Sequence, residues 1–116
     1  MKKYLIQETA TIKDALIAIN NITHNGESLI VINDQQQMVG SLTDGDIRRG
    51  LIAGAELSDM INKIMHRDFK CIKQEEYDVV HLKSFRDRCI LFIPILDDQK
   101  HVVDVGNLQK FKSKLP

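Results

Sequence analysis

A hydroxyl and a carboxylate lie three residues apart where the chain is expected to pass from a strand into a helix. They are Thr43 and Asp46, in the segment 40–49 with the sequence GSLTDGDIRR. The first amide groups of a helix lack partners within it and carry partial positive charge, so they favour an anion. Thr43 can donate to a phosphate oxygen, and ionised Asp46 can accept both hydroxyls of a ribose. With Arg48 and Arg49 offsetting the phosphate charge, the segment predicts a ribose-phosphate site.

A purely structural interpretation fits the same residues. Aspartate is among the favoured N-cap residues, so Asp46 can simply open a helix that is predicted over about residues 46–53. Thr43 is then a surface turn residue, and both arginines are solvated. The local sequence does not choose between a helix cap and a binding site.

Two strands and a helix are predicted upstream of this segment. The apolar run Leu29–Ile32 and a second run, Met38–Leu42, predict adjacent strands. Thr11 and Asp14 have the spacing of a capping box. The helix that begins at this box is expected to end at Asn25-Gly26. Apolar residues of that helix recur at helical spacing: Ala15, Ala18, Ile19 and Ile22.

Length and charge exclude several classes of function. The chain has 116 residues, of which 43% are hydrophobic, and this is enough to build a core. Its 16 basic residues balance 16 acidic ones, so no positive field attracts nucleic acid or an anionic membrane. No apolar run approaches a membrane span, and the N-terminus lacks a signal-peptide core. We therefore expect a cytoplasmic protein without nucleic-acid or membrane partners.

Residues that can bind metal or perform catalysis are scattered. Cys71 and Cys89 each lie beside an apolar run and are expected to be buried free thiols. The histidines have no ligand spacing with them, so no zinc site is expected. Asp44 and Asp46 alone would hold Mg²⁺ poorly. No nucleophile is paired with a base and no Walker-type phosphate loop is present, so the chain is not expected to be an enzyme by itself.

The chain repeats itself with an offset of 64 residues. Segment 29–34 falls on 93–98, and Met38-Val39 falls on Val102-Val103. Each half then predicts the order strand, helix, strand, strand, helix, with the first helix of the second half near residues 77–85. Because about sixty residues bury a core poorly, the halves are expected to share one.

The join between the halves completes a family resemblance. Residues 56–64 are predicted as helix or turn, and they lead into KIMHRDF at 63–69. Together with the repeat and the 40–49 segment, this join resembles a tandem pair of cystathionine-β-synthase (CBS) domains, a Bateman module. The resemblance covers residues from about Thr9 to Phe111.

The resemblance implies a fold and a class of ligand. The implied fold is α/β (α+β), with two βαββα repeats at residues 1–62 and 63–116 that are related by a pseudo-twofold axis within one compact module. Clefts between such repeats bind adenine nucleotides. AMP is the expected regulatory ligand, with ADP and ATP as alternatives, and no tightly bound cofactor or metal is expected. A homodimer is also implied.

The resemblance assigns residues to one of these clefts. Gly40, Thr43 and Asp46 match the family's glycine, hydroxyl and aspartate, of which the last two contact phosphate and ribose. Arg48 is expected to add positive charge beside them. The base is expected to be bound by the opposite repeat, through Lys70, Cys71, Ile72, Phe92, Ile93 and Pro94.

The second repeat departs from the family's pattern. The stretch 101–108, HVVDVGNL, reads as about two residues short and contains no threonine or serine. Asn107 is placed where the aspartate should recur, but an amide cannot accept two hydroxyl protons as a carboxylate does. Asp104 would repel a phosphate. We therefore expect one competent cleft and one degenerate cleft.

The TDGDIRR form of the motif is similar to two subgroups of the family. One is the module ahead of sugar-phosphate nucleotidyltransferase domains, and the other is the module behind sugar-phosphate isomerase domains. The ending, VVDV at 102–105 followed by a short helix, is more similar to the first subgroup. We therefore expect a regulatory module of an attached nucleotidyltransferase. The alternatives are the isomerase module and a structural dimerisation unit with empty clefts.

Overall fold

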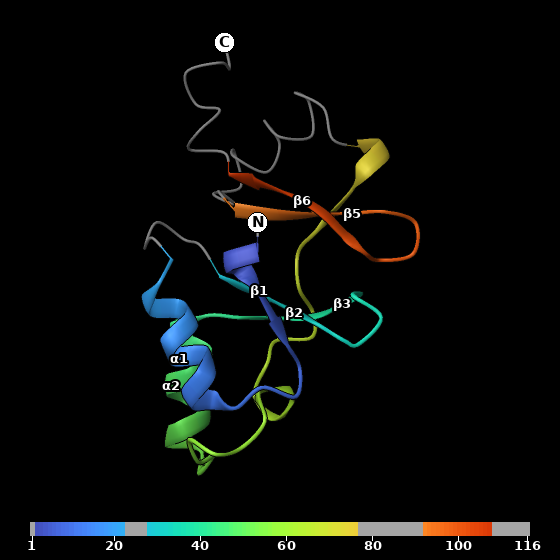
Figure 1. Cartoon of the computed structure of the whole chain (residues 1–116). Coiled ribbons are helices and arrows are strands. Elements are labelled where there is room, and N and C mark those ends of the chain that lie inside the picture. Colours follow the sequence, from blue (N-terminus) through green and yellow to red (C-terminus); the bar gives the residue numbers. More distant parts are fainter. Residues whose placement is uncertain (1, 23–27, 77–91, 108–116) are drawn as a thin grey trace. The chain divides into compact units, whose positions relative to one another are not determined.

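A computed structural model describes residues 2–22, 28–76 and 92–107 of the chain (Figure 1). The chain divides into two compact units, residues 1–69 and 70–116, and each contains its own three-stranded sheet. This division lies seven residues beyond the boundary that the sequence suggested, at 62/63. The difference arises because the intervening segment is hydrogen-bonded to the first sheet.

The first unit combines its sheet with two helices. β2 (Leu29–Ile32) is the central strand, parallel to β1 (Leu5–Gln7) and antiparallel to β3 (Met38–Leu42). All residues of β2 are buried, whereas β3 alternates buried and half-buried residues, so one face of β3 is turned to the core. α1 (Ile12–Asn20) and α2 (Asp44–Ile52) pack against each other (Figure 1).

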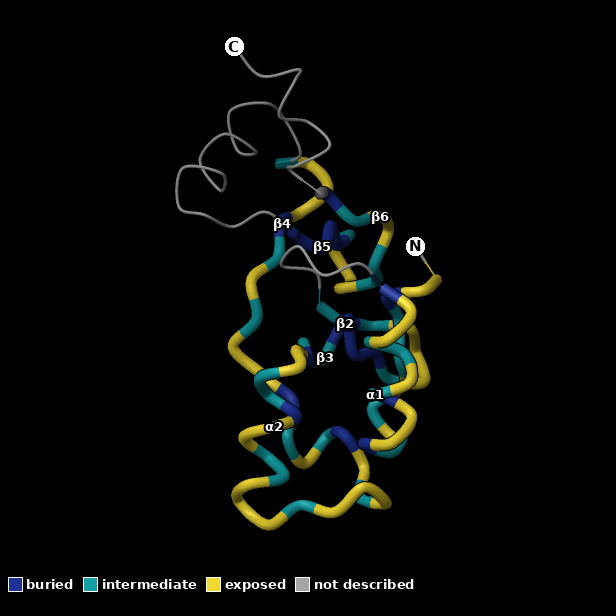
Figure 2. The backbone as a smooth tube through the Cα atoms, turned by 90° about the vertical axis from the view of Figure 1, so that its left-hand side faces the viewer, coloured by how far each residue is buried: buried dark blue, intermediate teal, exposed yellow. Residues whose placement is uncertain are grey.

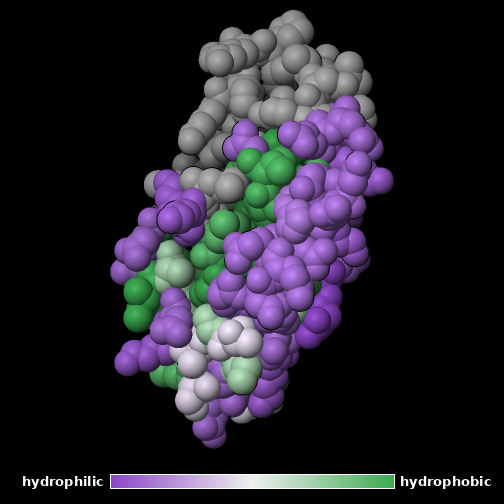
Figure 3. Space-filling model, turned by 45° about the vertical axis from the view of Figure 1, so that its right-hand side comes forward, coloured by the Kyte–Doolittle hydropathy of each residue, from purple (hydrophilic) through white to green (hydrophobic). Residues whose placement is uncertain are grey.

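The core of the first unit follows the apolar periodicity of the sequence. Ile12 and Ala15 of α1 and Ile47 of α2 are fully buried, and each such isoleucine contributes about 1.5–3 kcal/mol through burial. Figure 2 shows the buried residues gathered mainly in the strands. Hydrophobic side chains also reach the surface beside hydrophilic ones on the face in Figure 3. Among the described residues of this unit, the exposed large apolar ones are Ile17, Ile52, Leu57 and Met60.

The second unit repeats the sheet topology of the first. β5 (Phe92–Leu96) is central, parallel to β4 (Ile72–Lys73) and antiparallel to β6 (Val102–Asn107). The helix predicted near residues 77–85 lies outside the described residues. The buried cluster of this sheet consists of Ile72, Ile93 and Ile95.

The two hairpins have the same register, offset by 64 residues. β2 pairs with β3, and β5 with β6, with an irregularity after Val31 in the first hairpin and after Ile95 in the second. The turns are also alike, because one side-chain oxygen of Asn33 or of Asp97 accepts two backbone amides. The fourth residue of each turn has a positive φ, 65° and 68°. The repeat predicted from the sequence therefore extends to the hydrogen bonds of the hairpins.

The segment after α2 belongs to the first unit. α2 ends at Ile52 with Ala53 as its C-cap, and the following Gly54 has a left-handed φ of 110°. The next amide, of Ala55, donates to the carbonyl of Gly50 at 3.0 Å. The chain later pairs with β3, because Ser41 and His66 exchange two backbone hydrogen bonds of 2.9 and 2.8 Å. Residues 56–64 form turns with one short 3-10 helix. The 3-10 helices of the described residues are Lys2–Tyr4, Ile61–Lys63 and Gln74–Glu76.

Candidate functional site

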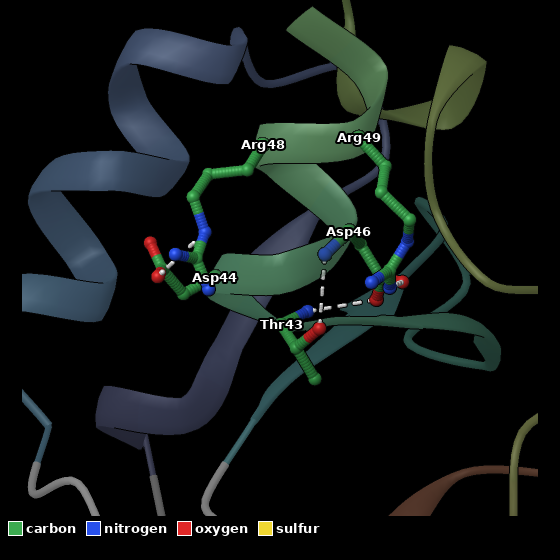
Figure 4. Close-up of polar contacts among 5 residues, drawn as sticks. All are labelled: Thr43, Asp44, Asp46, Arg48 and Arg49. Carbon is green, nitrogen blue, oxygen red and sulfur yellow. Dashed lines mark hydrogen bonds and ion pairs between the residues drawn. The ribbon is translucent and has the colours of Figure 1, made fainter. Parts of the chain in front are cut away.

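The helix α2 is capped by Thr43. The hydroxyl oxygen of Thr43 accepts the backbone N–H of Asp46 at 3.1 Å. In return, Asp46 Oδ2 accepts the backbone N–H of Thr43 at 2.9 Å, which completes a capping box (Figure 4). The prediction that Asp46 itself is the N-cap is wrong, because this reciprocal pair starts the helix two residues earlier, at Asp44.

The capping box leaves hydrogen-bonding capacity in both side chains. Within the described ranges, the hydroxyl hydrogen of Thr43 has no acceptor, since its oxygen is only an acceptor in the box. Each Asp46 oxygen accepts one bond, Oδ2 from Thr43 and Oδ1 from Arg49 Nη2 at 2.8 Å. A carboxylate has about four acceptor positions, so about two stay open. Thr43 is exposed and Asp46 half-buried, so a ligand can reach both.

The two adjacent arginines take different partners. Arg49 binds Asp46, whereas the Nε of Arg48 pairs with Asp44 Oδ2 at 3.3 Å. Figure 4 shows the two side chains leaving α2 on opposite sides, with Thr43 and Asp46 on the side of Arg49. A Cβ on Gly45 would lie 3.1 Å from Arg49 Nη1, so the guanidinium lies against the backbone of the first turn. The sequence could not distinguish these arginines.

Gly40 is required by the packing of β3. A Cβ at this position would lie 2.7 Å from Met65 Sδ and 3.2 Å from the backbone oxygen of His66. The absence of a side chain therefore allows the segment of Met65 and His66 to pair with Ser41. Gly40 thus fixes this segment beside β3, which ends at Leu42, directly before Thr43.

The first helix carries the same capping box in a different environment. Thr11 and Asp14 exchange bonds of 3.1 and 3.3 Å, which confirms the box predicted from the sequence. The next amides of α1, of Ile12 and Lys13, donate to the carbonyls of Asp59 and Leu57 at 2.9 and 3.1 Å. No described carbonyl accepts the corresponding amides of α2, at Asp44 and Gly45. The start of α1 is therefore covered by the chain's own backbone, whereas no described carbonyl covers the start of α2.

A pocket of about 410 Å³ adjoins Asp46 within the first unit. Its charged lining groups are Asp46, Arg49 and Lys63, and the Nζ of Lys63 also pairs with Asp59 at 3.1 Å. A volume of this size lies in the range of ligand sites. The remaining lining residues are small or apolar: Gly50, Ala53, Gly54, Ala55 and Ile64.

Two glycines and an ion pair shape this pocket. A Cβ on Gly50 would lie 2.6 Å from Ile64 Cγ2, so this glycine allows the chain after α2 to approach the helix. The pKa of Asp59 is lowered, first by the backbone amide of Glu56 and then by Lys63. Sequence reasoning missed this pocket, and glycines at 50 and 54 were its main signal.

The base-binding residues expected in the second unit have varied environments. Lys70 is exposed, whereas Ile72, Phe92 and Ile93 are buried, Ile72 and Ile93 in the cluster described above. Cys71 is a free thiol that is half-buried rather than buried as predicted, because it precedes the short β4. Burial raises the pKa of the Cys71 thiol, and the charge of Glu76 raises it further. Cys89 lies outside the described residues.

Pro94 is also buried, and its place in the sheet explains why a residue without a backbone N–H is tolerated there. It lies in the central strand β5 and pairs with Val105. The described pairs of β4 with β5 involve only Ile95 and Leu96, so Pro94 has one described neighbouring strand. A proline is tolerated where a strand is locally an edge.

The register corrects the alignment of the second motif. Asp104 pairs with Ile95 as Gly40 pairs with Val31, so Asp104 occupies the position of Gly40. Asn107 then corresponds to Thr43 and not to Asp46. Up to Asn107 the predicted shortfall of about two residues is absent, because both hairpins share one irregularity and one turn. The counterpart of Asp46, at position 110, lies outside the described residues.

Two kinds of feature are absent from the described residues. Residues 2–22, 28–76 and 92–107 contain no group of three or more His, Cys, Asp and Glu side chains placed to hold a metal ion. Over the same ranges, no helix has both the length and the apolar character needed to cross a membrane.

Related proteins match most of this chain over a minor part of their own length. Arabinose 5-phosphate isomerase GutQ of Escherichia coli K12 is 29% identical over 104 residues, which are 89% of this chain and 32% of GutQ. An uncharacterized protein of Helicobacter pylori J99 is 30% identical over 107 residues, 91% of this chain and 32% of that protein. The chain thus spans about a third of these relatives. No protein-family model matches it.

Solved structures resemble the chain over nearly its whole length. The CBS domains of a transcriptional regulator from Streptococcus pneumoniae match with a TM-score of 0.75 and 20% identity, over 97% of this chain and 89% of that one. The cytosolic domain of the Mg²⁺ channel MgtE, solved with ATP, matches with a TM-score of 0.74 and 15% identity, over 97% of this chain and 45% of that one. MJ1225 of Methanocaldococcus jannaschii, proposed as an archaeal homologue of g-AMPK, matches with a TM-score of 0.76 and 21% identity, over 95% of this chain and 46% of that one. The chain has the fold of CBS repeats, as its sequence predicted.

Proposed function

We propose that this chain is a regulatory module that binds an adenine nucleotide, AMP in preference to ADP or ATP, at Thr43 and Asp46. The observation that carries the proposal is the unused capacity of a capping box beside helix amides that, unlike those of α1, donate to no described carbonyl. The Thr43 hydroxyl can still donate to a phosphate oxygen, and Asp46 can still accept two hydroxyl protons, as a ribose diol requires. The open amides at the start of α2 favour the phosphate.

Two comparisons support a nucleotide as the ligand. The MgtE domain of the same fold was solved with ATP, and MJ1225 is described as similar to g-AMPK. In this proposal the base is bound by the residues that the family resemblance assigns in the second unit. Those residues are Lys70, Cys71, Ile72, Phe92, Ile93 and Pro94.

The proposed regulation acts on a sugar-phosphate enzyme in the remainder of a longer protein. The matches to GutQ favour an isomerase over the nucleotidyltransferase that the sequence ending suggested. The chain spans about a third of those relatives, so the remaining two thirds of such a protein can contain a catalytic domain. Control of that domain requires the nucleotide to bind two arrangements of the protein with different affinity. The alternative is a homodimerisation module with an empty site.

This proposal is tested by adding AMP to the full chain. Calorimetry measures the binding, and thermal unfolding measures the change in melting temperature. AMP at a hundred times its dissociation constant adds about 2.7 kcal/mol, a rise of several degrees for a domain of this size. The variant Thr43→Ala/Asp46→Ala should lose this shift. Its matched control is Thr11→Ala/Asp14→Ala, which removes the same capping bonds at a covered helix start. No shift with millimolar AMP, ADP or ATP excludes the proposal.

A further inference from the structure

The ion pair between Arg49 and Asp46 joins the capping box to the pocket. Arg49 Nη2 lies 2.8 Å from Asp46 Oδ1, and both residues line the pocket with Lys63. We propose that Arg49 is the residue by which this site selects a phosphorylated ligand over the corresponding nucleoside. On binding, the guanidinium leaves Asp46 for the phosphate while a ribose hydroxyl takes its place on Oδ1. This inference rests on the proposed nucleotide function and names the specificity determinant of the same site.

The exposure of the pair makes such an exchange easy. The side chain of Arg49 is 72% exposed, whereas that of Asp46 is 15% exposed. A pair with one solvated partner contributes little stability, so a ligand hydroxyl replaces the guanidinium on Asp46 at small cost. A guanidinium is a planar fork that binds two phosphate oxygens at once, and such bonds are among the strong ones. The exchange therefore leaves both charged groups paired.

Arg48 lacks these properties. It has nearly the same exposure, 73%, but it pairs with Asp44 on the opposite side of α2 (Figure 4). It is also absent from the residues that line the pocket. The two arginines therefore provide a matched pair of the same residue type on the same helix.

The box of α1 shows that capping does not require the arginine. Thr11 and Asp14 form the same reciprocal bonds as Thr43 and Asp46. The residue three positions after Asp14 is Ile17, which is exposed and apolar. An arginine at the equivalent position of α2 is thus not part of the cap, and its charge is available for a ligand.

Calorimetric titration of the full chain with AMP and with adenosine tests the inference. Arg49→Gln should weaken AMP binding by about tenfold to a hundredfold, the effect of one lost charge-assisted interaction. Adenosine affinity should change by less than about threefold, because its hydroxyls still bind Asp46. Arg49→Lys should recover part of the AMP affinity, since lysine keeps the charge but not the fork. Arg48→Gln should preserve the preference for AMP over adenosine.

Three outcomes overturn the inference. An unchanged AMP-to-adenosine ratio in Arg49→Gln removes Arg49 from phosphate recognition. Equal losses for both ligands mean that Arg49 only positions Asp46. If Arg48→Gln loses more of the preference for AMP over adenosine than Arg49→Gln does, the phosphate is recognised on the other side of α2. Failure of the proposed function looks different, because the wild-type chain, folded by circular dichroism, would then bind neither AMP nor adenosine.

Discussion

A methyl group at position 40 tests how the end of β3 is built. In the variant Gly40→Ala, the new Cβ would lie 2.7 Å from Met65 Sδ and 2.9 Å from its Cγ. The same atom would lie 3.2 Å from the carbonyl oxygen of His66, which accepts the amide of Ser41 at 2.9 Å. Met65 is 7% exposed, so its side chain has little room to move away. Removing this clash therefore requires a backbone shift that strains the pairing of His66 with Ser41.

Two effects of opposite sign set the size of the loss. Overpacking of a well-packed site costs about 1–3 kcal/mol. Replacing glycine by alanine reduces the entropy of the unfolded chain and returns about 0.4–1 kcal/mol. Taken at the middle of each range, the two effects leave a loss of about 1 kcal/mol in the free energy of unfolding of Gly40→Ala. For a chain of this size the melting temperature should fall by several degrees.

Urea denaturation and thermal unfolding measure this loss against a control in the second hairpin. Asp104 has the register position of Gly40 but is exposed, and its side chain only accepts the amide of Val105. Asp104→Ala should therefore change stability by less than about 0.5 kcal/mol. Combining Gly40→Ala with Met65→Ala should cost less than the two losses together, because the truncated Met65 no longer clashes. The reasoning is refuted if Gly40→Ala unfolds at the wild-type urea concentration.

Two further predictions concern the chain after α2. Gly54→Ala should destabilise by about 1–2 kcal/mol in urea, because a φ of 110° disfavours a Cβ even with open space around it, and Gly54→Asn should cost less. An equal loss for alanine and asparagine would contradict this. Asp59 has a lowered pKa in the fold, so its contribution to stability is complete above the unfolded value of 3.8 and is lost as pH falls through the lowered pKa. Asp59→Asn should therefore flatten the acid limb of the stability curve, and identical acid limbs for both proteins would exclude the effect.

Local pattern was sufficient to predict two of the three strands of the first unit, β2 and β3. The runs 29–32 and 38–42 have the predicted bounds because each is apolar and bordered by residues that favour turns or caps. The start of α2 was misplaced because aspartate is favoured both as an N-cap and at the third helical position. A local count of favoured residue types cannot separate those positions, whereas the reciprocal bonds of Thr43 and Asp46 do.

The pocket and the partners of the arginines depend on tertiary structure. Arg48 and Arg49 are chemically identical neighbours, and only their places around the helix send one to Asp44 and the other to Asp46. The pocket exists because Ile64 approaches a glycine in α2, a contact between residues fourteen positions apart. The second motif was misaligned because its side chains were compared before its register was known. Hydrogen-bond pairing, not residue identity, placed Asp104 opposite Ile95.

A helix cap and a ligand site are not alternatives at Thr43 and Asp46. The box uses the acceptor side of the Thr43 hydroxyl and one position on Asp46 Oδ2, which leaves a donor hydrogen and further acceptor positions. The same is true of Thr11 and Asp14, so the residues themselves do not mark a site. The difference lies in Leu57 and Asp59, whose carbonyls accept the amides at the start of α1. Among the described residues, the same capping box thus starts one helix whose first amides donate to the chain's own carbonyls and another whose first amides have no described acceptor, so an anion can bind there.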